Sequence, residues 1–258
     1  MRVARVRSRL LVAFWFTLAL APAGASETPR AQAAHTIEWS GLTWLVREGG
    51  GSPGPNHWKA SNVTVGADGF LHLRIARDGR RWTCAEVESI ERLGFGTYTW
   101  VVDGLVAALD RKVVLGLFVY PTPDVGPDRT NEIDIEYARW GNAATRPGNF
   151  TVWPARSGLG SSFRTFRFSP TGRITTSSFV RAPDRVTFLA TDERNTTLGG
   201  WVFAPARPAR RIGQDPMPVH MNLWLFHGDP PANRQVAEIV IRSFSFTPAE
   251  SPDQARLR

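Results

Sequence analysis

The sequence has a single cysteine, Cys84, so no disulfide can form within the chain. A domain without disulfides must be stabilised by its hydrophobic core. With 42% hydrophobic residues, including 15 Phe and 10 Trp, the 258 residues have enough apolar material for one large core. Because free cysteines are usually buried and inert, we expect Cys84 to be a packed strand residue rather than a catalytic nucleophile.

Lysine is almost as rare. Lys59 and Lys112 are the only two lysines, and the remaining permanently charged cationic side chains are arginines. The net charge is +8, but four arginines fall within the first nine residues and the rest are scattered along the chain. Proteins that bind nucleic acids gather basic residues on one face or one helix. The scatter therefore argues against a nucleic-acid partner.

Long apolar runs are also missing, because none reaches the roughly 20 residues that a membrane-spanning helix needs. A shorter run from Leu10 to Ala21 follows the N-terminal arginines and precedes the small residues Ala23-Gly24-Ala25. This order is typical of a secretory signal peptide, which we predict over residues 1–25, with a linker over 26–34. We expect a protein that is secreted, either extracellular or periplasmic, and free of the membrane after cleavage.

The remaining chain shows no long amphipathic helix and alternates between apolar and polar residues in short segments. This alternation predicts half-buried strands over 69–75, 96–102, 186–189 and 238–246, and a more continuously apolar central strand over 113–120. Turn residues separate these segments at the spacing of a sandwich. We therefore predict one all-β sandwich domain over 35–248 and a flexible tail over 249–258.

Three longer Gly- and Pro-rich stretches interrupt the pattern, and we predict that they are loops forming the walls of a cleft. They run from Gly49 to Pro55, from Pro121 to Arg129 and from Phe203 to Pro218.

Three carboxylates stand at alternate positions of one predicted strand. Side chains alternate between the two faces of a strand, so Glu132, Asp134 and Glu136 would line one face. Ile133 and Ile135 would then enter the core on the other face. Acids in a row repel one another and are poor strand formers, so stability does not explain them. The pattern indicates a catalytic use.

The spacing suits glycoside hydrolysis. Glu132 and Glu136 are about 13 Å apart at their Cα atoms on an extended strand, and on a concave sheet their tips can approach the ~5–5.5 Å of a retaining glycosidase. Asp134 between them would hold a proton or a hydrogen bond and separate their pKa values. Two other interpretations remain open, a calcium site and a merely solvated strand face.

The segment Glu132-Ile133-Asp134-Ile135-Glu136 resembles the E-x-D-x-E active-site strand of glycoside hydrolase family 16, which includes lichenases, laminarinases and other β-glucanases. Asp68 to Leu73, Leu93 to Tyr98 and Met221-Asn222-Leu223-Trp224 resemble further segments of that family in the same order. The resemblance covers residues 40–247. It implies a β-jelly-roll sandwich of two antiparallel curved sheets, as in concanavalin A-like lectins and glucanases.

The resemblance also implies roles for individual residues. Glu132 matches the nucleophile, Asp134 the residue that assists it, and Glu136 the general acid/base. Matches to the substrate-binding positions of the family are Glu86, Phe118, Tyr120, Asn149, Asn222 and Trp224. Trp82, Trp140 and Trp153 are additional candidates for stacking on sugar rings.

Two departures from the family bear on the substrate. Thr130-Asn131 stands where lichenases have a Trp-Asp pair, and Glu88 stands where an arginine is common. The resemblance therefore predicts an altered donor side of the cleft, which leaves open another β-linked glucan or a galactan.

The sequence as a whole predicts a secreted, monomeric, retaining endo-acting glycosidase that hydrolyses a β-linked polysaccharide, its only expected partner. No cofactor or catalytic metal is predicted, and a structural calcium remains possible. The alternatives are a non-catalytic carbohydrate-binding protein of the same fold and a transglycosylase.

Overall fold

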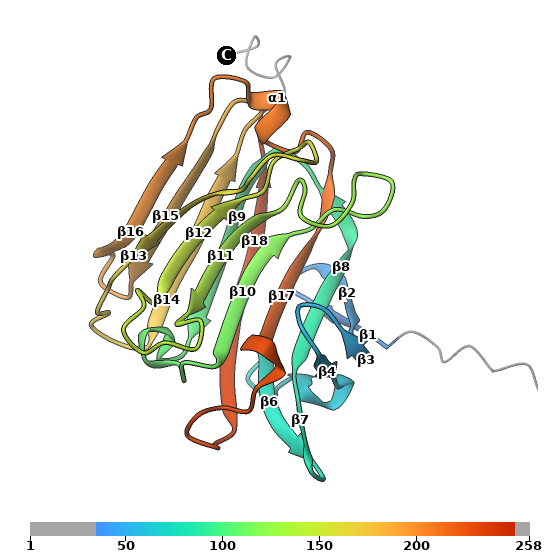
Figure 1. Cartoon of the computed structure of the whole chain (residues 1–258), viewed down its shortest axis with the longest axis vertical. Coiled ribbons are helices and arrows are strands. Elements are labelled where there is room, and N and C mark those ends of the chain that lie inside the picture. The colour runs from blue at the N-terminus through green and yellow to red at the C-terminus, as the bar shows by residue number, and fades with distance from the viewer. Residues whose placement is uncertain (1–34, 251–258) are drawn as a thin grey trace, which may run out of the picture. The chain divides into compact units, whose positions relative to one another are not determined.

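The computed structural model describes residues 35–250, which form a sandwich of two antiparallel β-sheets (Figure 1). One sheet, here called the groove sheet, contains eight strands. In spatial order they are β1 (Thr36–Trp39), β2 (Leu42–Val46), β8 (Ala85–Leu93), β17 (Met217–Leu225), β10 (Val113–Val119), β11 (Ile133–Ala138), β12 (Gly148–Val152) and β13 (Ser162–Phe166).

The second sheet, here called the outer sheet, covers the other side of the core. Its spatial order is β16 (Thr197–Phe203), β15 (Val186–Asp192), β14 (Ile174–Arg181), β9 (Gly96–Asp103), β18 (Ala237–Pro248), β6 (Leu71–Asp78) and β5 (Val63–Val65), with β7 (Arg81–Thr83) paired to β6. A separate hairpin joins β3 (Gly49–Gly51) to β4 (Asn56–Trp58). The described helices are the single turns η1 (Ala60–Asn62), η2 (Val106–Ala108), α1 (Pro208–Arg211) and η3 (Phe226–Gly228).

The predicted fold class, an all-β jelly-roll sandwich, is confirmed. Strands occur at each of the five segments where alternation predicted them, as β6, β9, β10, β15 and β18. The stretch from Gly49 to Pro55 was expected to contain no strand, but its first three residues form β3 because they pair with β4. Cross-strand hydrogen bonds outweigh the low strand propensity of glycine there.

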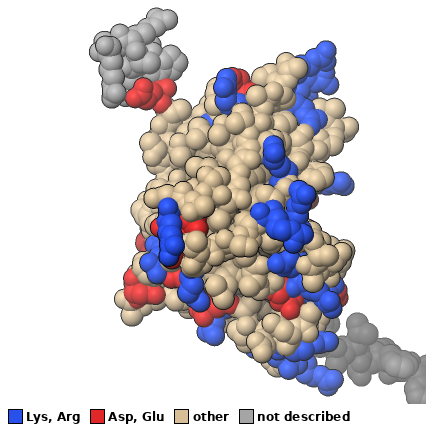
Figure 2. Space-filling view, turned by 90° about the vertical axis from the view of Figure 1, so that its left-hand side faces the viewer, with Lys and Arg blue, Asp and Glu red and all other residues tan. Residues whose placement is uncertain are grey.

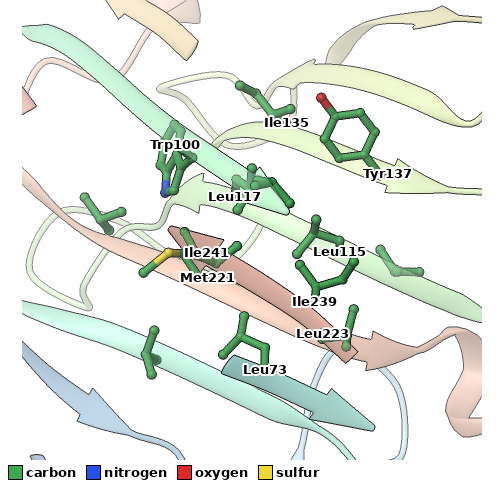
Figure 3. Close-up of a cluster of buried hydrophobic side chains, with 14 of the residues drawn as sticks. Leu73, Trp100, Leu115, Leu117, Ile135, Tyr137, Met221, Leu223, Ile239 and Ile241 are labelled. Carbon is green, nitrogen blue, oxygen red and sulfur yellow. The ribbon is translucent and has the colours of Figure 1, made fainter. Parts of the chain in front are cut away.

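The core lies between the sheets, where aliphatic and aromatic side chains from both layers meet (Figure 3). Ile133 and Ile135 are fully buried in it, as the alternation of β11 predicts. Cys84 is buried as well, and burial raises the pKa of its thiol to about 12. A thiol held protonated is a poor nucleophile, which confirms Cys84 as a packed residue.

Arg181 is the largest charged side chain buried in the sandwich. Its Nη2 donates hydrogen bonds to the carbonyl oxygens of Gly213 (2.8 Å) and Asp215 (2.7 Å). Its guanidinium also lies over the ring of Phe95, 5.2 Å from the centroid. Arg181 thus ties the segment that precedes β17 to the end of β14.

Within residues 35–250, no helix combines the length and the apolar character needed to cross a membrane. On the face shown in Figure 2, basic side chains outnumber acidic ones and are spread among uncharged residues. The predicted signal peptide (1–25), the linker (26–34) and tail residues 251–258 lie outside the described residues.

Candidate active site

The three acids lie at the beginning and along the length of β11. Glu132 directly precedes the strand, and its carbonyl oxygen accepts a hydrogen bond from the backbone N–H of Trp153 (2.8 Å). Asp134 and Glu136 follow within β11, where they are paired with Phe118 and Gly116 of β10. Because Ile133 and Ile135 fill the core, the acids face away from it, as expected for alternate residues of a strand.

The acids form part of the floor of a groove with a volume of about 820 Å³. Six neighbouring strands of the groove sheet contribute to its lining, in the order β2, β8, β17, β10, β11 and β12. At a strand spacing of about 4.8 Å, the groove extends roughly 24 Å across the sheet. It is therefore long enough for several sugar units in a row.

Glu132 and Asp134 are joined by a hydrogen bond between their side chains. Burial, together with the charges of Glu132 and Glu136, raises the pKa of Asp134 well above its usual range. Burial also raises the pKa of Glu132 to about 8, although the hydrogen bond to Asp134 acts in the opposite direction. The pair thus holds protons near neutral pH, and Asp134 is the donor in the hydrogen bond between the two side chains.

Trp153 fixes the carboxyl group of Asp134. Its indole Nε1 donates a hydrogen bond to Asp134 Oδ2 (3.2 Å), and the guanidinium of Arg129 lies 5.7 Å from the centroid of the Trp153 ring. Trp153 was only a candidate for sugar stacking from the sequence. In the structure it lines the groove and orients an acid at the same time.

Asn149 supports Glu136 from the neighbouring strand. The two residues are paired between β11 and β12, and Asn149 Nδ2 donates to Glu136 Oε2 (3.0 Å) and to Thr151 Oγ1 (2.9 Å). Burial raises the pKa of Glu136 to about 7, and the hydrogen bond from Asn149 limits the rise. Glu136 therefore differs from Glu132 in its partner, because an amide stabilises its charged form.

Glu86 occupies the other half of the groove, on β8. It accepts hydrogen bonds from Arg47 Nη1 (2.7 Å) and from the His220 ring at Nδ1 (3.2 Å). Burial opposes its ionisation, but these two partners outweigh burial and hold the pKa of Glu86 below its usual range. Glu86 is thus an ionised acceptor with a fixed orientation.

Aromatic rings form a second feature of the groove. Phe118 and His220 are stacked, with centroids 5.0 Å apart and planes 20° apart, and Tyr120 lies edge-on to Phe118 at 6.3 Å. Further along, Trp140 lies 6.2 Å from Trp224. All five rings line the groove. Such surfaces suit the apolar faces of sugar rings.

Asn222 contributes an acceptor to the middle of the floor. It is only 2% exposed, and no described protein group forms a hydrogen bond with its side-chain oxygen Oδ1. Its neighbour on β10 is Gly116, and a Cβ atom at that position would lie 2.4 Å from Asn222 Oδ1. Gly116 thus leaves room for the Asn222 amide over the floor, beside Glu136.

The structure brings together all ten residues that the sequence singled out as catalytic or substrate-binding. Nine of them line the groove, and Asn149 contacts it through Glu136. Sequence reasoning missed His220, Arg47 and Asp128. His220 had a signal, because it shares the strand parity of Asn222 and Trp224. Asp128 had one too, because it lies in the stretch from Pro121 to Arg129 that was predicted to be a wall of the cleft. Arg47 reaches the groove from a segment about 40 residues away from Glu86.

Three expectations about the groove were wrong in part. Trp82 lies on β7 beneath Arg77, and it does not line the groove. Thr130 and Asn131 are buried and do not line the groove, whereas Glu88 does. Of the loop from Phe203 to Pro218, only Pro218 lines the groove, because Arg181 ties the rest to the sandwich.

Acids are clustered in the groove, yet their arrangement does not suit a metal. Among residues 35–250, no group of three or more His, Cys, Asp or Glu side chains is arranged to hold a metal ion. The acids of β11 lie in a row along one strand rather than around a common centre.

No family model matches the sequence, and no curated protein matches it. Solved structures do match the fold. The β-glucanase of Bacillus licheniformis has a TM-score of 0.63 and 20% identity, covering 84% of this chain and 100% of that one. A glycoside hydrolase family 16 endo-glucanase from Bacteroides ovatus has a TM-score of 0.62 and 14% identity, covering 79% and 94%. A pseudo β-1,3-glucanase of Mycobacterium tuberculosis has a TM-score of 0.60 and 20% identity, covering 80% and 91%.

Proposed function

Since the chain has the jelly-roll fold of glycoside hydrolase family 16 enzymes, we propose that it is a retaining endo-β-glucanase. The observation that carries the proposal is the acid row at the floor of the groove. Glu132, Asp134 and Glu136 lie together there with raised pKa values, and each has a different hydrogen-bond partner. Ionisable groups with such shifted pKa values are typical of catalytic sites.

In the proposed first step, Glu132 attacks the anomeric carbon of a bound sugar and forms a glycosyl ester. The bond between that carbon and the glycosidic oxygen breaks, and Glu136 gives its proton to the departing oxygen. Asp134 keeps its proton and donates its hydrogen bond to Glu132. Its role is to hold the nucleophile as a carboxylate in a fixed orientation.

In the second step, Glu136 acts as a base. It takes a proton from a water molecule, which attacks the anomeric carbon and releases Glu132 as a carboxylate. Two inversions at the same carbon retain its configuration. A sugar hydroxyl in place of water would give transglycosylation, so the acceptor decides between the two reactions. Neither step requires a cofactor.

The charges of the groove favour an uncharged polysaccharide. Acidic side chains dominate its lining, and both arginines in it are engaged: Arg47 pairs with Glu86, and Arg129 lies over Trp153. A sulfated or uronate-containing chain would meet the ionised Glu86 and no arginine in the lining without a partner. The length of roughly 24 Å across the sheet supports cleavage within a chain rather than at its end. We further propose that the protein acts outside the cytoplasm, on the basis of the predicted signal peptide.

The experiment that tests this function measures hydrolysis of β-1,3-, β-1,4- and mixed-linkage glucans, with a galactan as a further substrate. Product sizes distinguish internal from terminal cleavage, and NMR of the fresh products gives their anomeric configuration. We expect internal cleavage with retention. Products of inverted configuration would contradict the double displacement.

Glu132→Gln is the decisive variant, because an amide cannot form the glycosyl ester. It should lose at least about 1,000-fold in kcat with an unchanged fold, since Gln preserves the size of the side chain. Glu193→Gln makes the same chemical change in an exposed turn of the outer sheet and should retain full activity. Equal activity of the Glu132→Gln variant and the unaltered protein would disprove the proposed mechanism.

A carbohydrate-binding protein of the same fold is the competing function, because one matching structure is described as a pseudo β-1,3-glucanase. Binding of gluco-oligosaccharides without any hydrolysis by the unaltered protein would identify it. Hydrolysis that disappears in the Glu132→Gln variant would exclude it.

A further inference from the structure

Phe163 is the most exposed of the large hydrophobic side chains in the described part of the chain, at 67%. It lies on β13, the edge strand of the groove sheet, directly beyond β12, where the lining of the groove ends. A phenyl ring in this position adds little to the core and leaves apolar surface in contact with water. Its position next to the end of the groove suggests a role in binding a ligand that extends out of the groove.

The register of the sheet decides which way Phe163 faces. Phe163 is paired with Thr151 of β12, and Thr151 is paired with Asp134 of β11. Directly paired residues share a face of the sheet, and both Thr151 and Asp134 line the groove. Phe166 follows three positions later and therefore points to the opposite face, where its ring centroid lies 4.6 Å from that of Phe150. Phe163 therefore stands on the groove face.

The position of Phe163 also fits the path of an extended sugar chain. The groove crosses the strands, and Phe163 continues the line from His220 through Phe118, Asp134 and Thr151. Two strand spacings separate it from Asp134, about 10 Å, which corresponds to about two pyranose units. A chain long enough to extend past β12 would reach the ring.

The strand that presents the ring is held in place. β13 is paired with β12 along its whole length, from Ser162 to Phe166. Arg211 Nη2 donates a hydrogen bond to Ser162 Oγ (2.7 Å), next to Phe163 in the sequence. The backbone under the ring is thus fixed before a ligand arrives, which reduces the entropy lost on binding.

We propose that Phe163 is an outer sugar-binding platform, on which a pyranose ring of a β-glucan stacks beyond the central groove. The inference rests on the proposed function for the identity of the ligand, and it adds a specificity for long chains. Sugars over the acid row do not contact the ring, whereas a longer chain gains one stacking contact.

The test uses binding rather than turnover. In the Glu132→Gln background, dissociation constants are measured by calorimetry for β-gluco-oligosaccharides from the trisaccharide to the octasaccharide, with and without Phe163→Ala. We expect the added substitution to weaken binding of the longest ligands about three- to tenfold and to leave the trisaccharide unchanged. Phe163→Trp should restore the length dependence, because it keeps an aromatic face.

Val202→Ala is the matched control, because Val202 is an exposed apolar residue on an edge strand of the outer sheet, at 57%. An equal effect of Phe163→Ala on short and long ligands, or an equal effect of Val202→Ala, would overturn the inference. Failure to bind any gluco-oligosaccharide would overturn it too.

The two proposals fail separately. Length-dependent binding that needs Phe163, in a protein without hydrolysis, would contradict the endo-glucanase and keep the platform. Hydrolysis with retention, in a protein whose Phe163→Ala variant binds oligosaccharides of all lengths normally, would support the endo-glucanase and contradict the platform.

Discussion

At the scale of single residues, the groove distinguishes two glutamates by their partners. Glu132 is next to an acid that shares a proton with it, and Glu136 is next to an amide that stabilises its charge. The hydrogen bond from Asp134 favours the carboxylate form of Glu132, which is the form that a nucleophile needs.

Asn149→Ala tests whether Asn149 limits the pKa of Glu136. Glu136 works as an acid only while protonated, and its pKa is raised to about 7 by burial and held there partly by the hydrogen bond from Asn149. Removing that bond destabilises the carboxylate, so the pKa of Glu136 should rise further. The alkaline limb of kcat against pH should then move to higher pH. A limb that stays in place or moves to lower pH would contradict this role of Asn149.

Much of the residue-level site could be predicted, because one strand carries the acids and alternation shows their face. The same rule applied to Asn222 and Trp224 on β17, and it would have found His220. Arg47 was not predictable. It reaches Glu86 because β2 and β8 are neighbours in the sheet, a pairing across about 40 residues that no local pattern encodes.

At the scale of elements, β10 and β17 show how a glycine shapes the floor. Their pairing sets Gly116 opposite Asn222, and the amide of Asn222 occupies the space above the glycine. A side chain on β10 at this point would compete with the amide rather than with the backbone. A substitution at Gly116 should therefore disturb the Asn222 amide in the groove more than the packing of the fold.

Gly116→Ala should damage activity more than stability. The new Cβ would lie 2.4 Å from Asn222 Oδ1, which is the end of a flexible side chain, so the amide can rotate away at little cost to the fold. We expect kcat/KM on glucan to fall about tenfold, as for the loss of one well-placed polar contact, and Tm to change little. Gly200→Ala in the outer sheet is the control, where the nearest atom would be at an ordinary 3.6 Å. A large fall in Tm with unchanged activity per folded molecule would contradict the prediction.

The errors at this scale came from loops and from a short strand. Trp82 follows a turn after β6, and only the pairing of β7 with that strand places it far from the groove. The loop before β17 has the composition of a groove wall, but the buried Arg181 binds its carbonyl groups and draws it toward the sandwich. Long-range contacts of this kind are not visible in composition.

At the scale of the whole molecule, the acid row makes stability depend on pH in an unusual direction. The pKa values of Glu132 and Glu136 in the fold, about 8 and about 7, lie above those of an unfolded chain. The folded state thus binds more protons than the unfolded state between about pH 4.5 and pH 8. Linkage then requires that these groups reduce stability as the pH rises through that range.

Glu136→Gln should relieve part of this effect, because Gln resembles the protonated acid. We expect its Tm to match that of the unaltered protein near pH 5 and to exceed it by about 5 °C near pH 8, which for a domain of this size corresponds to roughly 2 kcal/mol. Thermal unfolding at a series of pH values measures the difference, with Glu193→Gln as the control. An equal Tm difference at both pH values would mean that Glu136 titrates alike in the folded and unfolded states.

The order of the strands has a consequence for folding during synthesis. β18 is the last of the described strands, yet it lies in the middle of the outer sheet, between β9 and β6 (Figure 1). It pairs Ser245 with Thr99 and Val240 with His72, partners made far earlier on the ribosome. Until β18 emerges, the outer sheet is divided into two parts and the core lacks Ile239 and Ile241. The described domain should therefore reach its stable fold only after β18 has been synthesised.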